Sequence, residues 1–332
     1  MEATISSSTW QGTDAWTLES SDLRVVTIPS LGAKLVSLLD RRSGCEWLVM
    51  AEDRPLQPVP YGALFHEQDM SGWDEMFPTI VACAYPGPGK HHSVALPDHG
   101  EVWTLPWRVT DAEAGRLTMV VEGRALPYQL ERTLTCRMPD TLELSYRLTN
   151  RGDDAMPYIW AAHPQFECGP DSEIVFPPQI TEVCNTLPAA WGWGAPETIL
   201  HWPDAVDSVG QPVRLDRVGS PALRRGRKLF ALPAARPQWA GVVRRPAGDW
   251  LHLAWDAAAV PYLGLWVDEG ALSRASVVAP EPTTGFYDSL AIAWTKQEVV
   301  VVAAGATHTW SLTVRLGTKN QPRPALWQQL AV

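Results

Sequence analysis

Two ionisable side chains stand inside otherwise apolar stretches of the sequence, and both can move protons. His163 ends the apolar run 159–162 and directly precedes a proline. Glu281 stands between Pro280 and Pro282, after another apolar run. A histidine with a pKa of about 6.5 and a glutamate with a pKa of about 4.3 can give and take protons near neutral pH. The two residues are therefore candidates for general acid–base chemistry.

A further candidate region combines polar and aromatic residues in two loops. The first loop contains Trp73, Asp74 and Glu75, and the second contains His99 and Trp103. Such side chains would form a polar rim with flat rings, against which the apolar face of a sugar can pack. The second loop also reads Pro-Asp-His-Gly, which is a good turn sequence by itself. Two plain turns therefore explain the same residues.

Each ionisable residue also has an ordinary structural explanation. A lone histidine such as His163 is commonly a hydrogen-bonded residue of the core or of a sheet edge. Glu281 is compatible with a solvated loop at a strand end, although an acid is costly to bury without a reason. These alternatives stay open for each residue alone. The combination of one histidine, one carboxylate and polar neighbours is what favours a catalytic site.

The elements that must position these residues are β-strands. Apolar or alternating segments bounded by turns predict strands over residues 23–28, 33–39, 46–49, 117–122, 128–136, 141–150, 156–163, 239–244, 250–255, 298–302 and 309–316. Residues 13–19 and 323–330 are expected to be short helices at most. Repeated helical crossovers are missing from the sequence pattern, and 29 prolines and 24 glycines punctuate the chain. We therefore predict one all-β domain over residues 1–332, a sandwich of antiparallel sheets.

Charge and cysteine content narrow the classes of partner. With 27 Lys+Arg against 37 Asp+Glu, the formal net charge is −10, which repels phosphate backbones and anionic lipids. Neither nucleic acid nor a membrane is expected as a partner, and the short basic cluster 224–228 is expected to be a solvated loop. Five scattered cysteines and an N-terminus unlike a signal peptide predict a cytoplasmic protein without a structural metal site.

The order of these motifs resembles the aldose 1-epimerase (galactose mutarotase-like) superfamily, from about residue 20 to residue 317. The resemblance rests on His99-Gly100, His163, Glu281-Pro282 and a late hairpin that ends in Trp266. It implies a two-layer supersandwich of large antiparallel sheets, with the site in a cleft on a concave face. It also implies that His163 is the general acid, Glu281 the general base and His99 a sugar-binding residue.

The activity that the resemblance implies is mutarotation, which needs no cofactor. A base removes the proton of the anomeric hydroxyl, and an acid on the opposite side of the sugar protonates the ring oxygen. The ring opens and then closes on the other face. The predicted sugar-binding residues are His99, Asp74, Glu75, Trp73, Trp103 and Trp266.

The substrate is expected to be a non-phosphorylated sugar. Trp103 stands where the hexose 6-phosphate branch of the superfamily carries an arginine, and Glu101 adds a like charge. Arg132, Arg227 or Lys228 remain candidates for reaching a phosphate.

Two other functions stay open. The same fold can serve a protein that binds or senses a sugar without catalysis. A polysaccharide lyase or hydrolase on a similar sandwich is the second alternative, and Asp74 and Glu75 are candidates for its carboxylates. The sequence predicts neither the sugar nor the oligomeric state.

Overall fold

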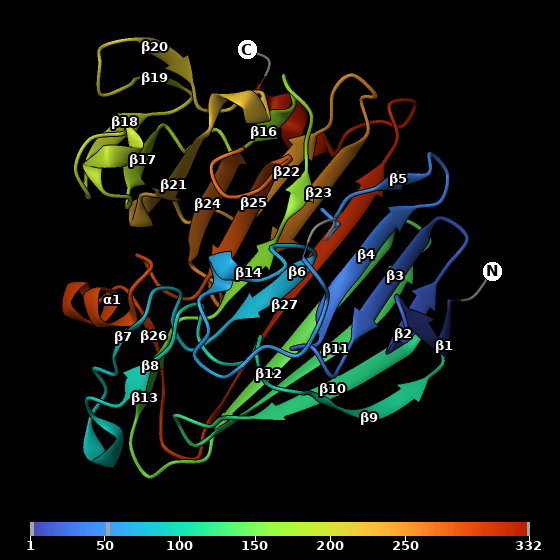
Figure 1. Cartoon of the computed structure of the whole chain (residues 1–332), viewed down its shortest axis with the longest axis vertical. Coiled ribbons are helices and arrows are strands. Elements are labelled where there is room, and N and C mark those ends of the chain that lie inside the picture. Colours follow the sequence, from blue (N-terminus) through green and yellow to red (C-terminus); the bar gives the residue numbers. More distant parts are fainter. Residues whose placement is uncertain (1–2, 51–53, 331–332) are drawn as a thin grey trace.

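Two large antiparallel sheets make up most of the structure. The computed structural model describes residues 3–50 and 54–330. Among these residues the larger sheet has thirteen strands and the smaller sheet has eight. The strands of both sheets run along the same diagonal in Figure 1, and short hairpins and the helix α1 (Leu290–Lys296) lie at their margins. The predicted all-β architecture with few helices is confirmed.

The larger sheet has the strand order β1-β2-β3-β4-β6-β14-β25-β24-β21-β17-β18, with β5 on β4 and β15 on β25. Its strands are β1 (Thr4–Trp10), β2 (Thr13–Glu19), β3 (Leu23–Ile28), β4 (Lys34–Asp40), β5 (Cys45–Glu46), β6 (Trp73–Met76), β14 (Ala161–Pro164), β15 (Phe166–Glu167), β17 (Glu182–Asn185), β18 (Ile199–His201), β21 (Arg225–Ala231), β24 (Tyr262–Glu269) and β25 (Ser276–Thr283).

The smaller sheet has the order β16-β22-β23-β27-β12-β11-β10-β9. Its strands are β9 (Arg108–Glu113), β10 (Arg116–Glu122), β11 (Tyr128–Met138), β12 (Thr141–Asn150), β16 (Glu173–Val175), β22 (Trp239–Val243), β23 (Trp250–Trp255) and β27 (Thr307–Gly317). Short pairs outside the sheets are β7 (Cys83–Ala84) with β8 (Ala95–Leu96), β13 (Met156–Tyr158) with β26 (Val300–Val302), and β19 (Asp204–Val206) with β20 (Pro212–Arg214). The 3-10 helices are η1 (Phe65–Glu67), η2 (Gly89–His91), η3 (Ala189–Trp191), η4 (Pro221–Leu223), η5 (Pro233–Ala235) and η6 (Ala325–Leu330).

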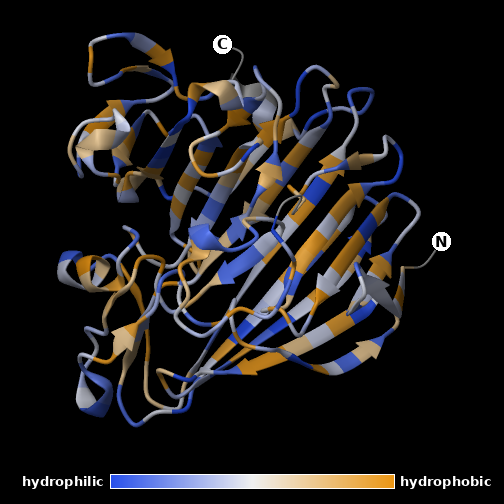
Figure 2. Ribbon diagram, in the orientation of Figure 1, coloured by the Kyte–Doolittle hydropathy of each residue, from blue (hydrophilic) through white to orange (hydrophobic). Residues whose placement is uncertain are grey.

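The alternation of side chains explains how the sheets pack. Along β11, Leu130 and Leu134 are buried while the residues between them are more exposed, apart from the buried Arg132. Figure 2 shows the same alternation of apolar and polar positions along many strands. Since successive side chains of a strand point to opposite faces, each sheet has one apolar face for the core.

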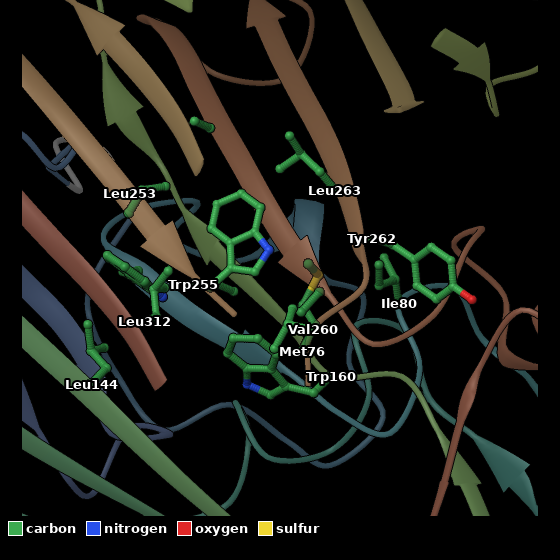
Figure 3. Packing of buried hydrophobic residues seen from close by; sticks show 14 of the residues in the cluster. Met76, Ile80, Leu144, Trp160, Leu253, Trp255, Val260, Tyr262, Leu263 and Leu312 are labelled. Atoms are coloured by element: carbon green, nitrogen blue, oxygen red, sulfur yellow. The ribbon is translucent and has the colours of Figure 1, made fainter. Parts of the chain in front are cut away.

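The core fills the space between the two sheets. Trp160 lies at its centre, with ring centres 4.8 Å from Tyr146 and 5.1 Å from Trp310. Figure 3 shows Trp160 in one buried cluster with Leu144 and Leu312 of the smaller sheet and Met76 of the larger sheet. The aromatic rings therefore connect the two layers.

Three predictions about local structure are wrong. Residues 13–19 form strand β2 instead of a helix, because β1 and β3 both pair with them. Residues 156–163 do not form one continuous strand, since β13 pairs with β26 and β14 belongs to the larger sheet. The basic cluster 224–228 is no solvated loop, because most of it belongs to β21, where Arg227 and Lys228 are buried.

The short helical elements agree with the prediction only in part. A short helical segment near the C-terminus was expected over 323–330 and is found as η6. The helix α1 was not predicted, because its seven residues are too few to show a helical period. In the described part of the chain, no helix is long and apolar enough to cross a membrane.

Candidate functional site

Two central strands of the larger sheet bring His163 and Glu281 together. β14 pairs with β25 at Ala161 and Thr283, so that residues 118 positions apart in sequence lie side by side. His163 Nδ1 is 2.9 Å from Glu281 Oε1, and both side chains are buried. The two candidates for acid–base chemistry are therefore in direct contact.

The second carboxylate oxygen of Glu281 is bound by Lys228 of β21. The lysine ammonium donates a hydrogen bond to Glu281 Oε2. β24 runs between β21 and β25, and its Gly264 stands opposite Glu281. A Cβ atom at Gly264 would lie 3.1 Å from Glu281 Oε2. The glycine therefore leaves the space through which the carboxylate reaches the ammonium.

Asp288 lies on the other side of Lys228. Its Oδ1 is 3.5 Å from Lys228 Nζ, and its Oδ2 accepts a hydrogen bond of 2.6 Å from Thr186 Oγ1. Among the described residues, Asp288 Oδ1 receives no hydrogen bond. We call His163, Lys228, Glu281 and Asp288 the cleft cluster.

The environment of the cleft cluster determines its protonation. Burial lowers the pKa of His163 to about 4, so the imidazole is neutral at pH 7. Burial would raise the pKa of Glu281, but Lys228 and His163 outweigh burial and hold this pKa below its ordinary value. Burial would lower the pKa of Lys228, but Glu281 and Asp288 raise it instead. Because an ionised carboxylate can only accept, the proton of His163 is on Nδ1, and Nε2 keeps its lone pair.

A second histidine approaches from the loop that follows β8. The ring centre of His99 is 5.5 Å from that of His163, and Phe65 stacks on His99 at 4.3 Å. Asp98 Oδ1 is 3.1 Å from His99 Nδ1, and Asp98 Oδ2 accepts a 2.9 Å hydrogen bond from the backbone N–H of Phe65. Burial would raise the pKa of Asp98, but these neighbours lower it. The loop therefore carries a carboxylate and an imidazole to the cleft cluster.

These groups line a cleft of about 190 Å³. Its walls include Phe65, Asp98, His99, His163, Lys228, Trp266 and Asp288. The predicted residues His99, His163 and Trp266 thus share one cleft, and Glu281 lies beneath His163 and Lys228, fully buried. Within the described residues, no group of three or more His, Cys, Asp or Glu side chains is arranged to hold a metal ion.

Trp73 and Glu75 do not reach this cleft, which contradicts their predicted role in sugar binding. Both side chains are fully buried. Glu75 accepts hydrogen bonds from Arg132 Nη1 at 2.9 Å, Tyr146 Oη at 2.8 Å and Trp160 Nε1 at 2.8 Å. Arg132 and Tyr146 belong to the smaller sheet. We call Glu75, Arg132, Tyr146 and Trp160 the core cluster, because it links the two sheets.

Asp74 and Trp103 are also absent from the walls of the cleft, and they support it from behind. Asp74 of β6 stands opposite His163 in register, and its carboxylate is 2.8 Å from the ammonium of Lys34. Burial raises the pKa of Asp74 to about 6. Trp103 Nε1 donates a 3.1 Å hydrogen bond to the carbonyl oxygen of Asp98 and so helps to hold the loop that carries the second histidine.

The different positions of Asp74 and Glu75 follow from the pleat of β6. Neighbouring side chains of a strand point to opposite faces. Glu75 points to the smaller sheet, so Asp74 and its register partner His163 lie on the outer face. Two carboxylates on opposite faces of a sheet cannot act on the same glycosidic bond. The polysaccharide-cleaving alternative therefore loses its pair of carboxylates.

The predicted arrangement of the acid–base pair needs a correction. An acid and a base were expected on opposite sides of a sugar ring, but the 2.9 Å contact between His163 and Glu281 leaves no room for a ring between them. Both carboxylate oxygens of Glu281 are bound, one by His163 and one by Lys228. His163 is therefore the member of the pair that faces the cleft.

Ten of the residues that line the cleft lie outside the predicted catalytic and sugar-binding residues, and these ten include Phe65, Asp98, Lys228 and Asp288. One of them had a signal in the sequence. Lys228 directly precedes the apolar run 229–231, as a residue of a buried strand would. Phe65 and Asp288 lie in or beside loops, where no periodic pattern indicates which side chains meet.

Comparisons with known proteins bear on the fold. No protein-family model and no curated protein matches the chain. A galactose mutarotase-like protein from Lactobacillus casei is 18% identical with a TM-score of 0.68, and the match covers 91% of this chain and 100% of that one. A galactose mutarotase related enzyme from Lactobacillus acidophilus is 14% identical with a TM-score of 0.64, covering 93% and 100%. A candidate aldose 1-epimerase from Klebsiella pneumoniae is 16% identical with a TM-score of 0.71, covering 100% and 88%. The predicted galactose mutarotase-like fold is therefore confirmed.

Proposed function

We propose that the protein is a mutarotase, an isomerase that interconverts the α and β anomers of an uncharged sugar. The cleft cluster carries this proposal, because a neutral imidazole and a lysine ammonium share one carboxylate at the wall of a small cleft. The fold supports the proposal as well. Its solved relatives are named galactose mutarotase-like proteins and candidate aldose 1-epimerases.

Mutarotation acts on two oxygen atoms that are bonded to the same carbon. The hydroxyl on C1 loses its proton, a C1=O double bond forms, and the bond from C1 to the ring oxygen breaks while that oxygen gains a proton. Rotation of the open chain and the reverse steps give the other anomer. Since both oxygens sit on C1, the base and the acid must be neighbours. His163 and Lys228 meet this requirement, because both bind Glu281.

The roles of the residues follow from their protonation. Nε2 of His163 removes the anomeric proton, and Lys228 donates a proton to the ring oxygen. Glu281 holds His163 in the tautomer with its proton on Nδ1 and stabilises the imidazolium that forms. His163 is thus the base in the opening step, and Glu281 is a positioning residue. These roles replace the acid and base roles that the resemblance implied.

The charge of the cleft favours an uncharged substrate. Lys228 already faces two carboxylates, those of Glu281 and Asp288. Arg132 and Arg227, the other cations considered for a phosphate, are buried in ion pairs of their own. Each of these three cations is therefore already paired with a carboxylate, and none is free to bind a phosphate dianion.

Other wall residues suit a sugar ring. Trp266 offers a flat apolar surface to its C–H face. Asp288 Oδ1, which lacks a hydrogen-bond donor among the described residues, can accept a bond from a sugar hydroxyl. His99 stands beside His163, where it can bond the same end of the ring.

The test measures anomer exchange of glucose and galactose with purified protein, by polarimetry or exchange NMR. The wild type is expected to accelerate the exchange of at least one sugar, and His163→Ala should lower this acceleration by about 10²–10⁴-fold because the base is lost. The matched control is His201→Ala, since His201 is an exposed histidine at the sheet edge. Circular dichroism of both variants checks that they fold.

Two outcomes would contradict the proposal. If His163→Ala stays fully active, His163 is not the base. If the wild type binds a sugar without accelerating its exchange, the protein is a non-catalytic sugar-binding protein of the same fold.

The location of the protein in the cell is a separate proposal. The five cysteines form no disulfide, as is usual in the reducing cytoplasm. We therefore propose a cytoplasmic location, which fractionation of the source cells tests.

A further inference from the structure

A second and larger hollow adjoins the cleft. Its volume is about 450 Å³, against about 190 Å³ for the cleft. Met70 and Leu272 line both spaces and form the ridge between them. Small-molecule sites in proteins commonly have volumes of about 300–1,000 Å³. The cleft alone is smaller than this range, whereas the hollow falls within it.

One wall of the hollow is fixed by a buried carboxylate. Asp268 is fully buried and accepts hydrogen bonds from the backbone N–H groups of Ala271 at 2.6 Å, Leu272 at 3.1 Å and Ser273 at 2.8 Å. These bonds hold the loop between β24 and β25. Leu272 and Ser273 are therefore presented to the hollow by a restrained backbone.

The segment that carries Met70 is held by the buried ammonium of Lys34. Lys34 donates hydrogen bonds of 2.7 Å to both carboxylate oxygens of Asp69 and one of 3.0 Å to the carbonyl oxygen of Ser71. Met70, between them, has a φ of +52°, a conformation that a non-glycine residue adopts only when its surroundings enforce it. The ridge residue is thus clamped from both sides.

The chemistry of the lining indicates the ligand. Arg54 and Ser273 carry hydrogen-bond donors, and Glu167 carries acceptors. Asp69, whose carboxylate is bound by Lys34, adds a negative charge to the lining. Charges of both signs face the same space, so neither an anion nor a cation is favoured throughout. The ridge residue Leu272 adds an exposed apolar surface. A neutral ring with many hydroxyl groups and an apolar face matches this mixture.

We propose that the hollow binds a second sugar unit, so that the substrate is a reducing oligosaccharide with its reducing end in the cleft. This inference rests on the proposed function, because it assigns the ring that reacts to the cleft. The two spaces share the ridge of Met70 and Leu272, so one glycosidic linkage would cross that ridge.

The experiment compares maltose, cellobiose and lactose with glucose as substrates in the exchange assay. At least one disaccharide should have a kcat/KM about tenfold above that of glucose, equivalent to 1.4 kcal/mol of extra binding. Ala275→Trp, which fills the hollow, should remove this advantage and leave the kcat/KM of glucose unchanged. Ala271→Trp is the matched control, because Ala271 lies in the same loop and is not among the residues that line either space.

The outcomes separate this inference from the proposed function. If glucose exchange is accelerated but no disaccharide is preferred and Ala275→Trp has no effect, the hollow is not a sugar site and the mutarotase proposal stands. If the protein accelerates the anomer exchange of no sugar, the mutarotase proposal fails. Calorimetry with the same disaccharides then tests whether the hollow binds a sugar. Disaccharide binding that Ala275→Trp weakens and Ala271→Trp leaves unchanged would support the site, and a lack of binding would overturn it.

Discussion

Glu75 and Glu281 are both fully buried carboxylates of the larger sheet, and each is bound by a cation. In the core cluster, Glu75 is held by a guanidinium, a phenol and an indole, which join the two sheets. In the cleft cluster, Glu281 is held by an imidazole and an ammonium that line an open cleft. The same acid thus has two different environments within one sheet.

The difference lies in the partners and not in burial. Burial raises the pKa of Tyr146 well above its ordinary value, and burial also raises the pKa of Glu75. The core cluster contains no imidazole, and none of its four residues lines the cleft. The cleft cluster contains a neutral imidazole with a free lone pair, and Asp288 Oδ1 has no donor among the described residues. A buried acid indicates chemistry when its partners can exchange protons and one side stays open to a ligand.

The largest expected effect is on stability, from Arg132→Met in the core cluster. Removing the guanidinium leaves Glu75 as a buried charge without a counter-ion, so the free energy of unfolding should fall by about 3–5 kcal/mol. Urea denaturation followed by tryptophan fluorescence measures this loss. Arg151→Met is the control, because Arg151 pairs with Glu122 at an exposed position and should change stability by at most about 1 kcal/mol.

The loss of unfolding free energy in Lys228→Met should be smaller than in Arg132→Met, because the cleft cluster is open to water and the core cluster is not. Glu281 then keeps its bond to His163, and water in the cleft can reach the cluster. An equal loss in Arg132→Met and Lys228→Met would show that the two clusters do not differ as described.

The second-largest expected effect is a loss of catalytic rate in Lys228→Met. Loss of the proton donor to the ring oxygen should lower kcat by about 10²-fold, with a smaller change in KM. Lys228→Arg keeps the positive charge and the donors and should retain more activity than Lys228→Met. Exchange NMR at several sugar concentrations separates kcat from KM. A change in KM alone would mean that Lys228 only binds the sugar.

A matched pair of glutamine substitutions separates the two carboxylates more finely. Glu281→Gln removes the charge that stabilises the imidazolium, so kcat should fall by about tenfold while the unfolding free energy changes little. Glu75→Gln leaves Arg132 without a counter-ion, so stability should fall by about 1–3 kcal/mol while kcat of the folded protein is unchanged. Reversed results in the two variants would contradict the proposed roles.

The sequence predicted most of the architecture because strand patterns are local. The predicted strand over residues 23–28 is found as β3, and the predicted hairpin of 239–244 and 250–255 is found as β22 and β23. The short strands β13 and β14 were merged into one, because a bend between two apolar segments leaves no gap in the apolar pattern.

The site was harder to predict because it depends on contacts between distant strands. His163 and Glu281 stood out as ionisable residues in apolar sequence, and they do meet. The register between β6 and β14 determines which residues of β6 share a face with His163. The sequence does not report this register, so it could not exclude Glu75 and Trp73 from the cleft. The approach of Lys228 depends on a glycine in the strand between, and no local pattern reports that contact.

The smallest expected effect is the pH dependence of the rate between pH 5 and 8. Burial lowers the pKa of His163 to about 4, so the base is already neutral throughout this range, and its activity is lost only as the pH falls through about 4. The rate above the spontaneous exchange should therefore change by less than about twofold from pH 5 to pH 8. In Lys228→Met the pKa of Glu281 rises, because the ammonium that lowers it is gone, and the acid limb of the profile should move to higher pH. A wild-type limb near the ordinary histidine value of about 6.5 would mean that His163 is not the buried neutral base that the cleft cluster requires.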